Sequence, residues 1–281
     1  MAKEDASFRY VVIGGGFAGE YAVRGIRKRD PDGAIALFST EPHPPYARPP
    51  LSKGLWLGGS EEKLPLRQAG YDEAGVKLFL GTEIVRIDRA AHVVADAGGR
   101  AFRHEKLLLA TGGRVKRLPF GQGLIHYFRT LDDYHALRAV ADGGEHLIVV
   151  GGGFIGAELA SALAQNSKQV TLVFPEAALL DRVLPEDLAA WVTDLYRQRG
   201  VQILSGDVPV EVRQVGEGPG RVRMRLRSGQ SLEADGVVAG IGIEPETRLA
   251  REAGLREDDG IVINAYLRTD DPDILDRKSV V

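Results

Sequence analysis

The sequence predicts an α/β protein built from two copies of one strand–turn–helix unit. The first copy is a β-rich run at 8–13 that ends in Gly14-Gly-Gly16 and continues at helical spacing. The second copy begins 137 residues later, where the run at 146–150 enters Gly151-Gly-Gly153. The chain has 281 residues, 44% of them hydrophobic, which at roughly 150 residues per domain is enough for two lobes with buried cores.

Each copy continues into a helix and a second buried strand. In the first, a helical pattern runs from Ala18 to Ile26 and the strand covers 34–38. In the second, the helical pattern runs from Ile155 to Leu163 and the strand covers 169–174. Repetition of this unit predicts a three-layer architecture with two Rossmann-like, dinucleotide-binding lobes.

The other elements are predicted more coarsely. We expect a buried strand at 107–110, a helix at 131–140 and short strands over 201–240. Pro185 is a favourable first-turn residue and opens a further helix. We expect that helix to bury a face formed by Leu188, Trp191, Val192 and Leu195.

Composition excludes several classes of protein. The net charge of −3 gives no strong attraction to nucleic acid or anionic membrane. The absence of cysteine excludes disulfides, cysteine-ligated zinc and iron–sulfur clusters held by these residues. The six histidines lack ligand spacing, so we predict no metal site. The start of the chain has no apolar signal core, and the most apolar run, 147–164, contains four glycines and Glu158. We therefore expect a cytoplasmic protein without membrane segments.

Both glycine runs match the pattern Gly-x-Gly-x-x-Gly after a strand and at a helix start. The first glycine permits the tight turn, the second lets the backbone approach a pyrophosphate, and the third lets helix and strand pack closely. Free N–H groups and the helix dipole then attract the anion. One such match can be a purely structural turn, but two matches in this context predict two phosphate-binding turns.

An acidic residue about 20 positions further on is expected to bind the adenosine ribose. Glu41 lies 22 residues after Gly19, and Glu176 lies 20 after Gly156. The alternative is a surface glutamate in a turn. A carboxylate repels a 2′-phosphate, and the nearest following arginine is Arg182, so NADH is favoured over NADPH. Two dinucleotide lobes imply two dinucleotides, and a flavin with a nicotinamide is the simplest pair.

Several further stretches carry a family resemblance. The sequence resembles the FAD- and NAD(P)H-dependent pyridine-nucleotide oxidoreductases, in the branch that holds apoptosis-inducing factor, ferredoxin reductases and rubredoxin reductases. The stretches are Glu41-Pro-His-Pro-Pro-Tyr-Ala-Arg-Pro-Pro-Leu-Ser-Lys-Gly-Leu-Trp56, Leu109-Ala-Thr-Gly-Gly113, Gly151-Gly-Gly-Phe-Ile-Gly-Ala-Glu-Leu-Ala160, Phe174-Pro-Glu176 and Gly240-Ile-Gly-Ile-Glu-Pro245.

The resemblance implies FAD in the first lobe and NADH in the second. It places Arg48 at the FAD phosphates, Lys53 near flavin N5, and Phe154 near the nicotinamide or over the flavin. The implied cofactor-binding residues are Gly14, Gly16, Phe17, Ala18, Gly19, Glu41, Arg48, Lys53, Ala110, Thr111, Gly112, Gly151, Gly153, Phe154, Ile155, Gly156, Glu158, Glu176 and Gly242.

The resemblance also implies that Lys53 pairs with Glu158, and these two are the predicted catalytic residues. Reduced flavin gains negative charge, which a fixed ammonium would stabilise. An unpaired buried lysine is costly, so a carboxylate partner is expected. The alternatives are a surface lysine and an exposed helix glutamate.

The family's domain order implies a division of the chain. We expect an FAD-binding domain at 1–118 and 243–281, with an NADH-binding domain inserted at 119–242. The family continues past its Pro-Asp-Ile segment with Gly-Asp and a third α+β domain. This chain continues past Ile274 with Leu275-Asp-Arg-Lys-Ser-Val-Val281. We therefore expect the third domain to be missing, and a dimer only where that domain is present.

Two functions remain open from the sequence. The first is a reductase that passes hydride from NADH to FAD, and electrons onward to a small electron-transfer protein or a small-molecule acceptor. The second is a slow-turnover, redox-sensing interaction protein similar to apoptosis-inducing factor, with an inactive fragment as a third possibility. Nucleic-acid binding rests only on the alternating Arg221, Arg223, Arg225 and Arg227, and a solvated face is the favoured interpretation.

Overall fold

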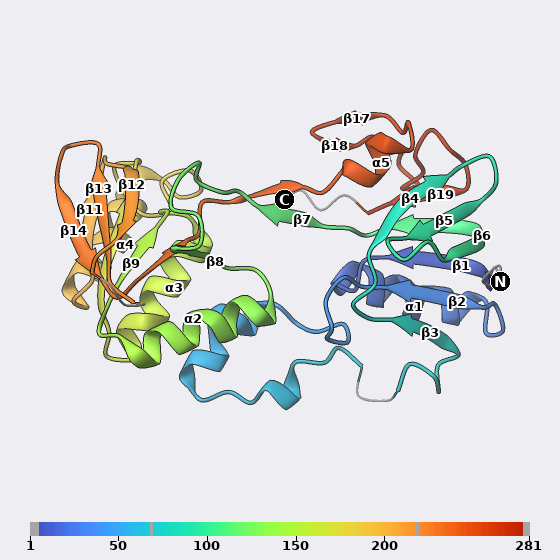
Figure 1. Cartoon of the computed structure of the whole chain (residues 1–281), viewed down its shortest axis with the longest axis horizontal. Helices are drawn as coiled ribbons and strands as arrows, with labels where there is room; N and C mark the ends of the chain where they lie inside the picture. Colours follow the sequence, from blue (N-terminus) through green and yellow to red (C-terminus); the bar gives the residue numbers. More distant parts are fainter. Residues whose placement is uncertain (1–5, 68–69, 217–219, 278–281) are drawn as a thin grey trace. The chain divides into compact units, whose positions relative to one another are not determined.

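The computed structural model describes residues 6–67, 70–216 and 220–277, and the chain divides into two compact units. Unit 1 comprises 1–47, 62–114 and 245–281, and unit 2 comprises 48–61 and 115–244 (Figure 1). The boundary runs through two short paired strands, β7 (Gly113–Val115) and β16 (Ile243–Pro245). The α/β class with two Rossmann-like lobes is confirmed, whereas the cofactor assigned to each stretch stays a prediction.

Unit 1 is built on a seven-stranded sheet of order β3-β2-β1-β6-β5-β4, with β19 also pairing with β6. Strands β1, β2, β3, β6 and β19 run parallel, and β4 and β5 add an antiparallel meander. The elements are β1 (Ala6–Ile13), α1 (Phe17–Arg29), β2 (Ile35–Phe38), η3 (Glu61–Lys63), β3 (Val76–Phe79), β4 (Ile84–Asp88), β5 (Val93–Asp96), β6 (Ala101–Leu109), α5 (Arg248–Glu252), β17 (Glu257–Asp258), β18 (Gly260–Ile261) and β19 (Ile274–Asp276).

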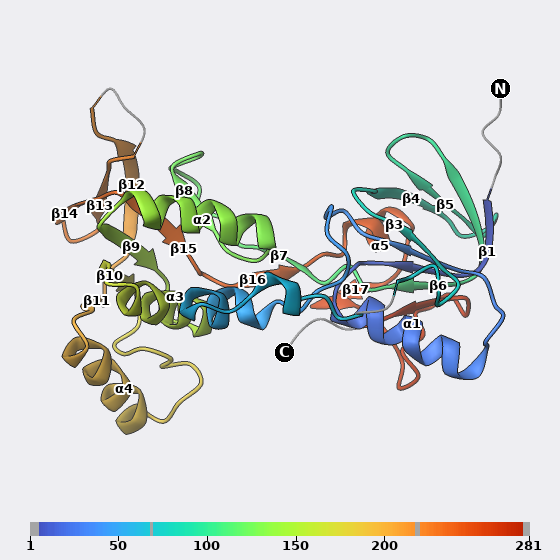
Figure 2. The same cartoon turned by 90° about the horizontal axis from the view of Figure 1, so that it is seen from below.

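The alternation of side chains along β1 builds both faces of this core. Val12 packs with Val23 of α1 on one face, and α1 lies against that side of the sheet (Figure 2). Val11 and Ile13 face the opposite side, where they join residues of β4, β5 and α5. Because both faces are covered, the ends of β1 and β6 that lie beside β2 and β19 are apolar, and β2 is apolar and buried at every position. These layers bring the carboxyl end of β1 to the first glycine turn.

Unit 2 repeats the plan with a five-stranded parallel sheet of order β11-β10-β9-β15-β8. A three-stranded antiparallel sheet, β12-β13-β14, covers one face through a shared apolar core. The elements are η1 (Pro49–Ser52), η2 (Gly54–Leu57), β8 (Ile125–Tyr127), α2 (Leu131–Gly143), β9 (His146–Val150), α3 (Phe154–Gln165), β10 (Gln169–Phe174), α4 (Glu186–Gln198), β11 (Gln202–Ser205), β12 (Pro209–Gln214), β13 (Val222–Leu226), β14 (Ser231–Ala234) and β15 (Gly236–Ala239).

Helix α4 corrects one prediction. The helix forms where the sequence predicts it, but its buried residues are Ala189 and Thr193. Leu188 and Trp191 are 42% and 62% exposed. Thr193 is buried because its hydroxyl donates to Ala189 O and accepts from the Leu179 N–H. Val192 and Leu195, the other two predicted residues, are half-buried, so hydrophobic spacing alone predicted the buried face of α4 only in part.

Candidate functional site

The first glycine turn has the geometry that the three predicted glycine roles require. Gly14 adopts φ +128°, and a Cβ there would lie 2.0 Å from the carbonyl oxygen of Ala110. A Cβ on Gly19 would lie 2.0 Å from the Gly14 carbonyl oxygen. On Gly16, by contrast, a Cβ would meet nothing within 4 Å among the described residues. The fold requires glycine at the first and third positions, and the second glycine leaves the backbone N–H groups accessible to a ligand.

The second turn, in unit 2, repeats this pattern. Gly151 adopts φ +115°, with the Cβ position 2.5 Å from the Gly240 carbonyl oxygen. On Gly156 a Cβ would lie 1.8 Å from the Gly151 carbonyl oxygen, whereas Gly153 faces open space in the described part of the chain. The two turns therefore present the same backbone surface to a ligand.

The helices behind these turns begin differently from α2. Thr130 caps α2 in a capping box with Asp133, so its side chain accepts a first-turn N–H. The N-cap residues of α1 and α3 are Gly16 and Gly153, which have no side chain to do this. The first-turn N–H groups of α1 and α3 can thus bind an anion, with the helix dipole in support. Both turns fit the pyrophosphate of a dinucleotide.

The two predicted ribose carboxylates have different partners. Glu41 accepts a hydrogen bond from the Tyr46 hydroxyl at 2.6 Å. Glu176 forms an ion pair with Arg182 at 2.6 Å, with the Glu176 side chain 20% exposed and that of Arg182 81% exposed. In the sequence, Arg182 is the nearest arginine after Glu176, and a contact between the two was not predicted. The contact places a solvent-exposed cation beside the predicted ribose carboxylate, which lessens the repulsion expected between that carboxylate and a 2′-phosphate.

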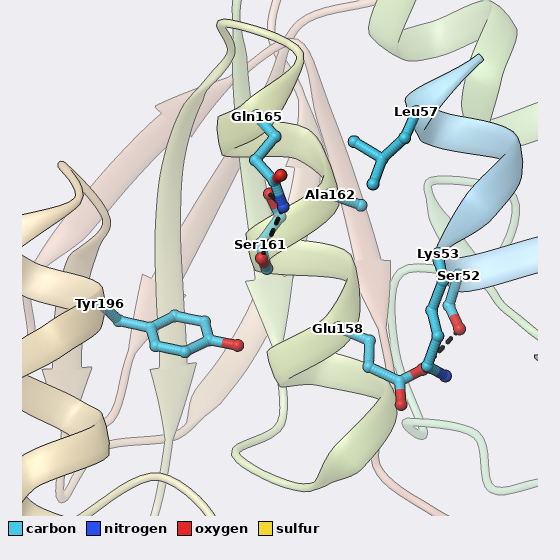
Figure 3. Close-up of a pocket in the computed structure, with 8 residues that line it drawn as sticks. All are labelled: Ser52, Lys53, Leu57, Glu158, Ser161, Ala162, Gln165 and Tyr196. Carbon is cyan, nitrogen blue, oxygen red and sulfur yellow. Dashed lines mark hydrogen bonds and ion pairs between the residues drawn. The ribbon is translucent and has the colours of Figure 1, made fainter.

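Lys53 and Glu158 lie together, both within unit 2. Lys53 Nζ lies 2.7 Å from Glu158 Oε2, and Ser52 Oγ donates to the same oxygen at 2.5 Å. Glu158 extends from α3 toward the segment that carries Lys53 (Figure 3). The lysine side chain is 52% exposed and that of Glu158 26%. The predicted pairing is therefore present, and Ser52 is a third member that sequence reasoning missed.

A cavity of about 230 Å³ adjoins this pair. Tyr196 of α4 also lines it and donates its hydroxyl hydrogen to Ala157 O at 3.0 Å. Burial raises the pKa of Tyr196, so its side chain stays a neutral donor at neutral pH. The lining residues are Ser52, Lys53, Leu57, Glu158, Ser161, Ala162, Gln165 and Tyr196 (Figure 3).

Other predicted cofactor residues are placed as follows. Thr111 Oγ1 donates to Glu246 O at 2.7 Å in unit 1, and Gly112 and Gly242 both have positive φ, +72° and +100°. Arg48 clusters with unit 2, where its guanidinium donates to Arg129 O at 2.7 Å. The aromatic rings of Phe17 and Phe154 are 41% and 61% exposed. The ligand contacts of these residues stay predictions.

The arginines of β13 and its flanking residues lie among acids. Arg223 pairs with Glu233 at 2.7 Å, and Arg225 lies 3.5 Å from Glu211. Arg221 is 4.0 Å from Asp235. These carboxylates offset the positive charge, which agrees with a solvated face.

The described part of the chain has neither a cluster of metal ligands nor a membrane-spanning helix. No group of three or more histidine, aspartate or glutamate side chains there could hold a metal ion. None of the helices in that part of the chain is both long and apolar enough to cross a membrane.

Comparison with known proteins gives consistent matches. The family described as pyridine nucleotide-disulphide oxidoreductase matches residues 8–275. A monodehydroascorbate reductase of Solanum lycopersicum is 36% identical over 96% of this chain and 67% of its own length. The anthranilate 1,2-dioxygenase system ferredoxin–NAD(+) reductase component of Burkholderia cepacia is 38% identical over 93% of this chain and 65% of its own.

A solved structure agrees with these sequence matches. Putidaredoxin reductase, crystallised in covalent complex with putidaredoxin, superposes with a TM-score of 0.90 at 34% identity. The match covers 97% of this chain and 67% of that one. The chain thus spans about two thirds of the length of these relatives.

Proposed function

The chain belongs to the pyridine nucleotide-disulphide oxidoreductase family of NAD(P)H-dependent flavoprotein oxidoreductases, and on that premise we propose that it reduces FAD with NADH and delivers electrons to a small ferredoxin-like protein. The observation that carries the proposal is the repeated glycine turn. In both units the outer glycines leave no room for a Cβ, while the middle glycine opens onto an uncapped helix.

We assign FAD to unit 1 and NADH to unit 2. In unit 1, the N–H groups at the start of α1 would hold the FAD pyrophosphate, and Glu41 would bind its ribose. In unit 2, the start of α3 would hold the NADH pyrophosphate, and Glu176 would bind its ribose hydroxyls. The bound FAD would supply hydride acceptance and stepwise electron release, which no side chain of this chain offers.

Lys53 would supply fixed positive charge near flavin N5, the position that the family resemblance implies. An ammonium held there favours the more negative, reduced flavin. Glu158 and Ser52 support the assignment, because Glu158 Oε2 pairs with the ammonium and also accepts the hydroxyl hydrogen of Ser52. Because Lys53 and Ser52 both contact this one oxygen, the Glu158 carboxylate restricts both of their side chains.

The nature of the acceptor follows from composition and from the relatives. The 281 residues contain no cysteine, so they offer no thiol pair to relay electrons from flavin to a disulfide. Among the relatives are a ferredoxin–NAD(+) reductase component and a putidaredoxin reductase. We therefore place a small iron–sulfur protein first as acceptor. The monodehydroascorbate reductases among the relatives favour a small organic radical as the second candidate.

The test begins with the visible spectrum of the purified chain reconstituted with FAD. We expect a bound-flavin spectrum that bleaches on anaerobic addition of NADH and returns on addition of an oxidised ferredoxin. Retained flavin that NADH does not reduce would contradict the hydride step. Reduction by NADH with a long-lived reduced flavin, unreactive toward ferredoxin and toward ascorbate radical, would favour the redox-sensing alternative.

Lys53→Ala tests the role of the ammonium. We expect flavin reduction at saturating NADH to slow by about 10-fold or more in stopped-flow measurements, within the range for loss of one preorganised electrostatic group. Lys106→Ala is the matched control, because Lys106 is also half-exposed and paired to a carboxylate, that of Asp273. A wild-type rate in Lys53→Ala would remove Lys53 from the mechanism.

A further inference from the structure

Hydrogen bonds from Trp56 hold the backbone turn that carries Lys53. Lys53 lies between η1 and η2, in the segment 48–61 that clusters with unit 2. The Trp56 indole Nε1–H donates to Leu51 O at 2.8 Å, and the Trp56 backbone N–H donates to Lys53 O at 3.1 Å. Trp56 is only 3% exposed. Residues 51–56 therefore form a closed turn of the backbone, and Lys53 is one of the residues of that turn.

Asn166, the C-cap residue of α3, anchors that turn. Its amide Nδ2 donates to Trp56 O at 2.9 Å and to Ala162 O at 2.8 Å. Its Oδ1 accepts from Arg138 Nη1 of α2 at 3.2 Å. One side chain thus joins α3, α2 and the segment 48–61, which lies beside α3 in both views (Figures 1 and 2).

Aromatic packing supports the same anchor. The Arg138 guanidinium lies 5.4 Å from the centroid of the Trp56 ring, and the Tyr134 ring meets Trp56 edge-on at 5.5 Å. Tyr134 and Arg138 are both on α2, four residues apart. The indole is therefore fixed by contacts on α2 as well as by its hydrogen bond to Leu51.

Glu158, the ion-pair partner of Lys53, and Asn166, which anchors the turn, both belong to α3. Glu158 and Asn166 are respectively near the start and at the C-cap of α3. A half-exposed ion pair is too weak to hold a long lysine side chain by itself. Because α3 holds both the carboxylate and the backbone turn that carries the lysine, the distance between the two charges is set by one rigid element.

We propose that Asn166 and Trp56 are positioning residues for Lys53, which hold its ammonium against Glu158. The proposed consequence for flavin reduction rests on the function proposed above, whereas the positioning itself does not. Neither residue is predicted to touch a coenzyme.

The test measures the reactivity of the Lys53 amine in the full chain. Trace labelling with acetic anhydride, read by mass spectrometry, reports how freely each lysine leaves its carboxylate. We expect Asn166→Asp, which loses the amide donor, and Trp56→Phe, which loses the indole N–H, each to raise Lys53 labelling about 3- to 10-fold, the factor expected for one or two ordinary hydrogen bonds. Glu158→Gln sets the value for a fully released lysine.

Lys106 is the internal reference, since general unfolding would raise its labelling as well. Asp194→Asn is the matched control variant, because Asp194 is an exposed carboxylate of unit 2 that pairs with Arg197 on the same helix, α4. We expect it to leave the ratio of Lys53 to Lys106 labelling unchanged. An unchanged ratio in both Asn166→Asp and Trp56→Phe would overturn the proposal.

A second measurement separates this proposal from the proposed function. In the flavin half-reaction we expect Asn166→Asp to lower the limiting rate about 3- to 10-fold while the NADH dissociation constant stays the same. A raised Lys53 ratio with wild-type flavin reduction in both Asn166→Asp and Lys53→Ala would uphold the positioning and reject the role of Lys53. An unchanged Lys53 ratio in the anchor variants, together with slow flavin reduction in Lys53→Ala, would uphold the role of Lys53 and reject the positioning by Asn166 and Trp56.

Discussion

The two glycine turns have nearly the same backbone and different surroundings. At both, the outer glycines would bring a Cβ within 2.5 Å of a carbonyl oxygen, and the middle glycine faces open space among the described residues. The carboxylates that follow differ, because Glu41 meets the neutral Tyr46 hydroxyl and Glu176 meets the Arg182 cation. Under the proposed function, pyrophosphate binding would depend on the shared backbone, while selectivity for the ribose would be set separately in each unit.

Breaking one turn at a time is expected to give the largest effects. A Cβ on Gly19 would overlap the Gly14 carbonyl and one on Gly156 the Gly151 carbonyl, so each turn must move. We expect Gly19→Ala to weaken FAD binding and Gly156→Ala to weaken NADH binding, each by about 100-fold, as roughly 3 kcal/mol of overpacking would produce.

Matched controls for these variants are Gly25→Ala in α1 and Gly143→Ala in α2, where a Cβ meets nothing within 4 Å among the described residues. Calorimetric titration with each coenzyme measures the effect. Loss of both coenzymes in either single variant would show that the two turns are not independent.

The two units are also expected to differ in their response to acid. Burial, and secondly the neighbouring His92, lowers the pKa of His104 in unit 1 to about 4. Both ring nitrogens of His104 are buried without a hydrogen-bond partner among the described residues. The pKa of His104 in the folded chain lies below the ordinary 6.5, so the folded state binds the proton less readily than the unfolded state. The contribution of neutral His104 to the free energy of unfolding is therefore complete above pH 6.5 and is lost as the pH falls toward 4.

The loss amounts to about 3 kcal/mol from this pKa difference, and His104→Phe should remove it. Both tryptophans of the chain, Trp56 and Trp191, lie in unit 2. Tryptophan fluorescence therefore reports that unit, while hydrogen exchange of β6 amides reports unit 1. Burial raises the pKa of the Asp276 carboxyl in β19 to about 6 and opposes this loss over the same pH range. We therefore expect β6 protection in His104→Phe to persist to a lower pH than in the unchanged chain, with no difference in fluorescence between the two. The same acid dependence in His104→Phe would contradict the assignment.

The preference for NADH over NADPH is expected to depend on the pair of Glu176 and Arg182 in unit 2. Removing the carboxylate in Glu176→Ala leaves Arg182 free to meet a 2′-phosphate, so we expect the preference for NADH over NADPH to fall about 10-fold, the worth of one charge-assisted contact. Arg182→Ala leaves the carboxylate unpaired and should raise that preference. Glu41→Ala in unit 1 is the control, since it should leave the NADH to NADPH ratio unchanged. Equal ratios in all variants would remove Glu176 from the ribose site.

The smallest effect concerns the contrast between capped and open helices. Thr130→Ala removes the side-chain cap of α2, and we expect a loss of about 1 kcal/mol in the free energy of unfolding. Binding of FAD and NADH should not change, because α2 carries no phosphate-binding turn. Denaturant unfolding and coenzyme titration on the same sample check both statements.

Local patterns predicted much of this architecture. The β-rich runs, both glycine turns and the helices behind them occur where the sequence places them, because they depend on neighbouring residues and on φ angles that only glycine adopts readily. The pairing of Lys53 with Glu158 was predicted only through the family resemblance. The buried face of α4 was predicted only in part, because spacing cannot tell which side of a half-exposed helix a loop will cover.

The sequence by itself determined where the two open glycine turns form, since a missing Cβ is a property of the residue. Only the tertiary structure decided what surrounds those turns. Arg182 folds back onto Glu176, Ser52 shares an oxygen with Lys53, and Asn166 reaches Trp56 across 110 positions of the chain. The contacts of Ser52 with Glu158 and of Asn166 with Trp56 join segments 106 and 110 positions apart, and the contact of Arg182 with Glu176 depends on how the loop between them folds. Local pattern encodes neither.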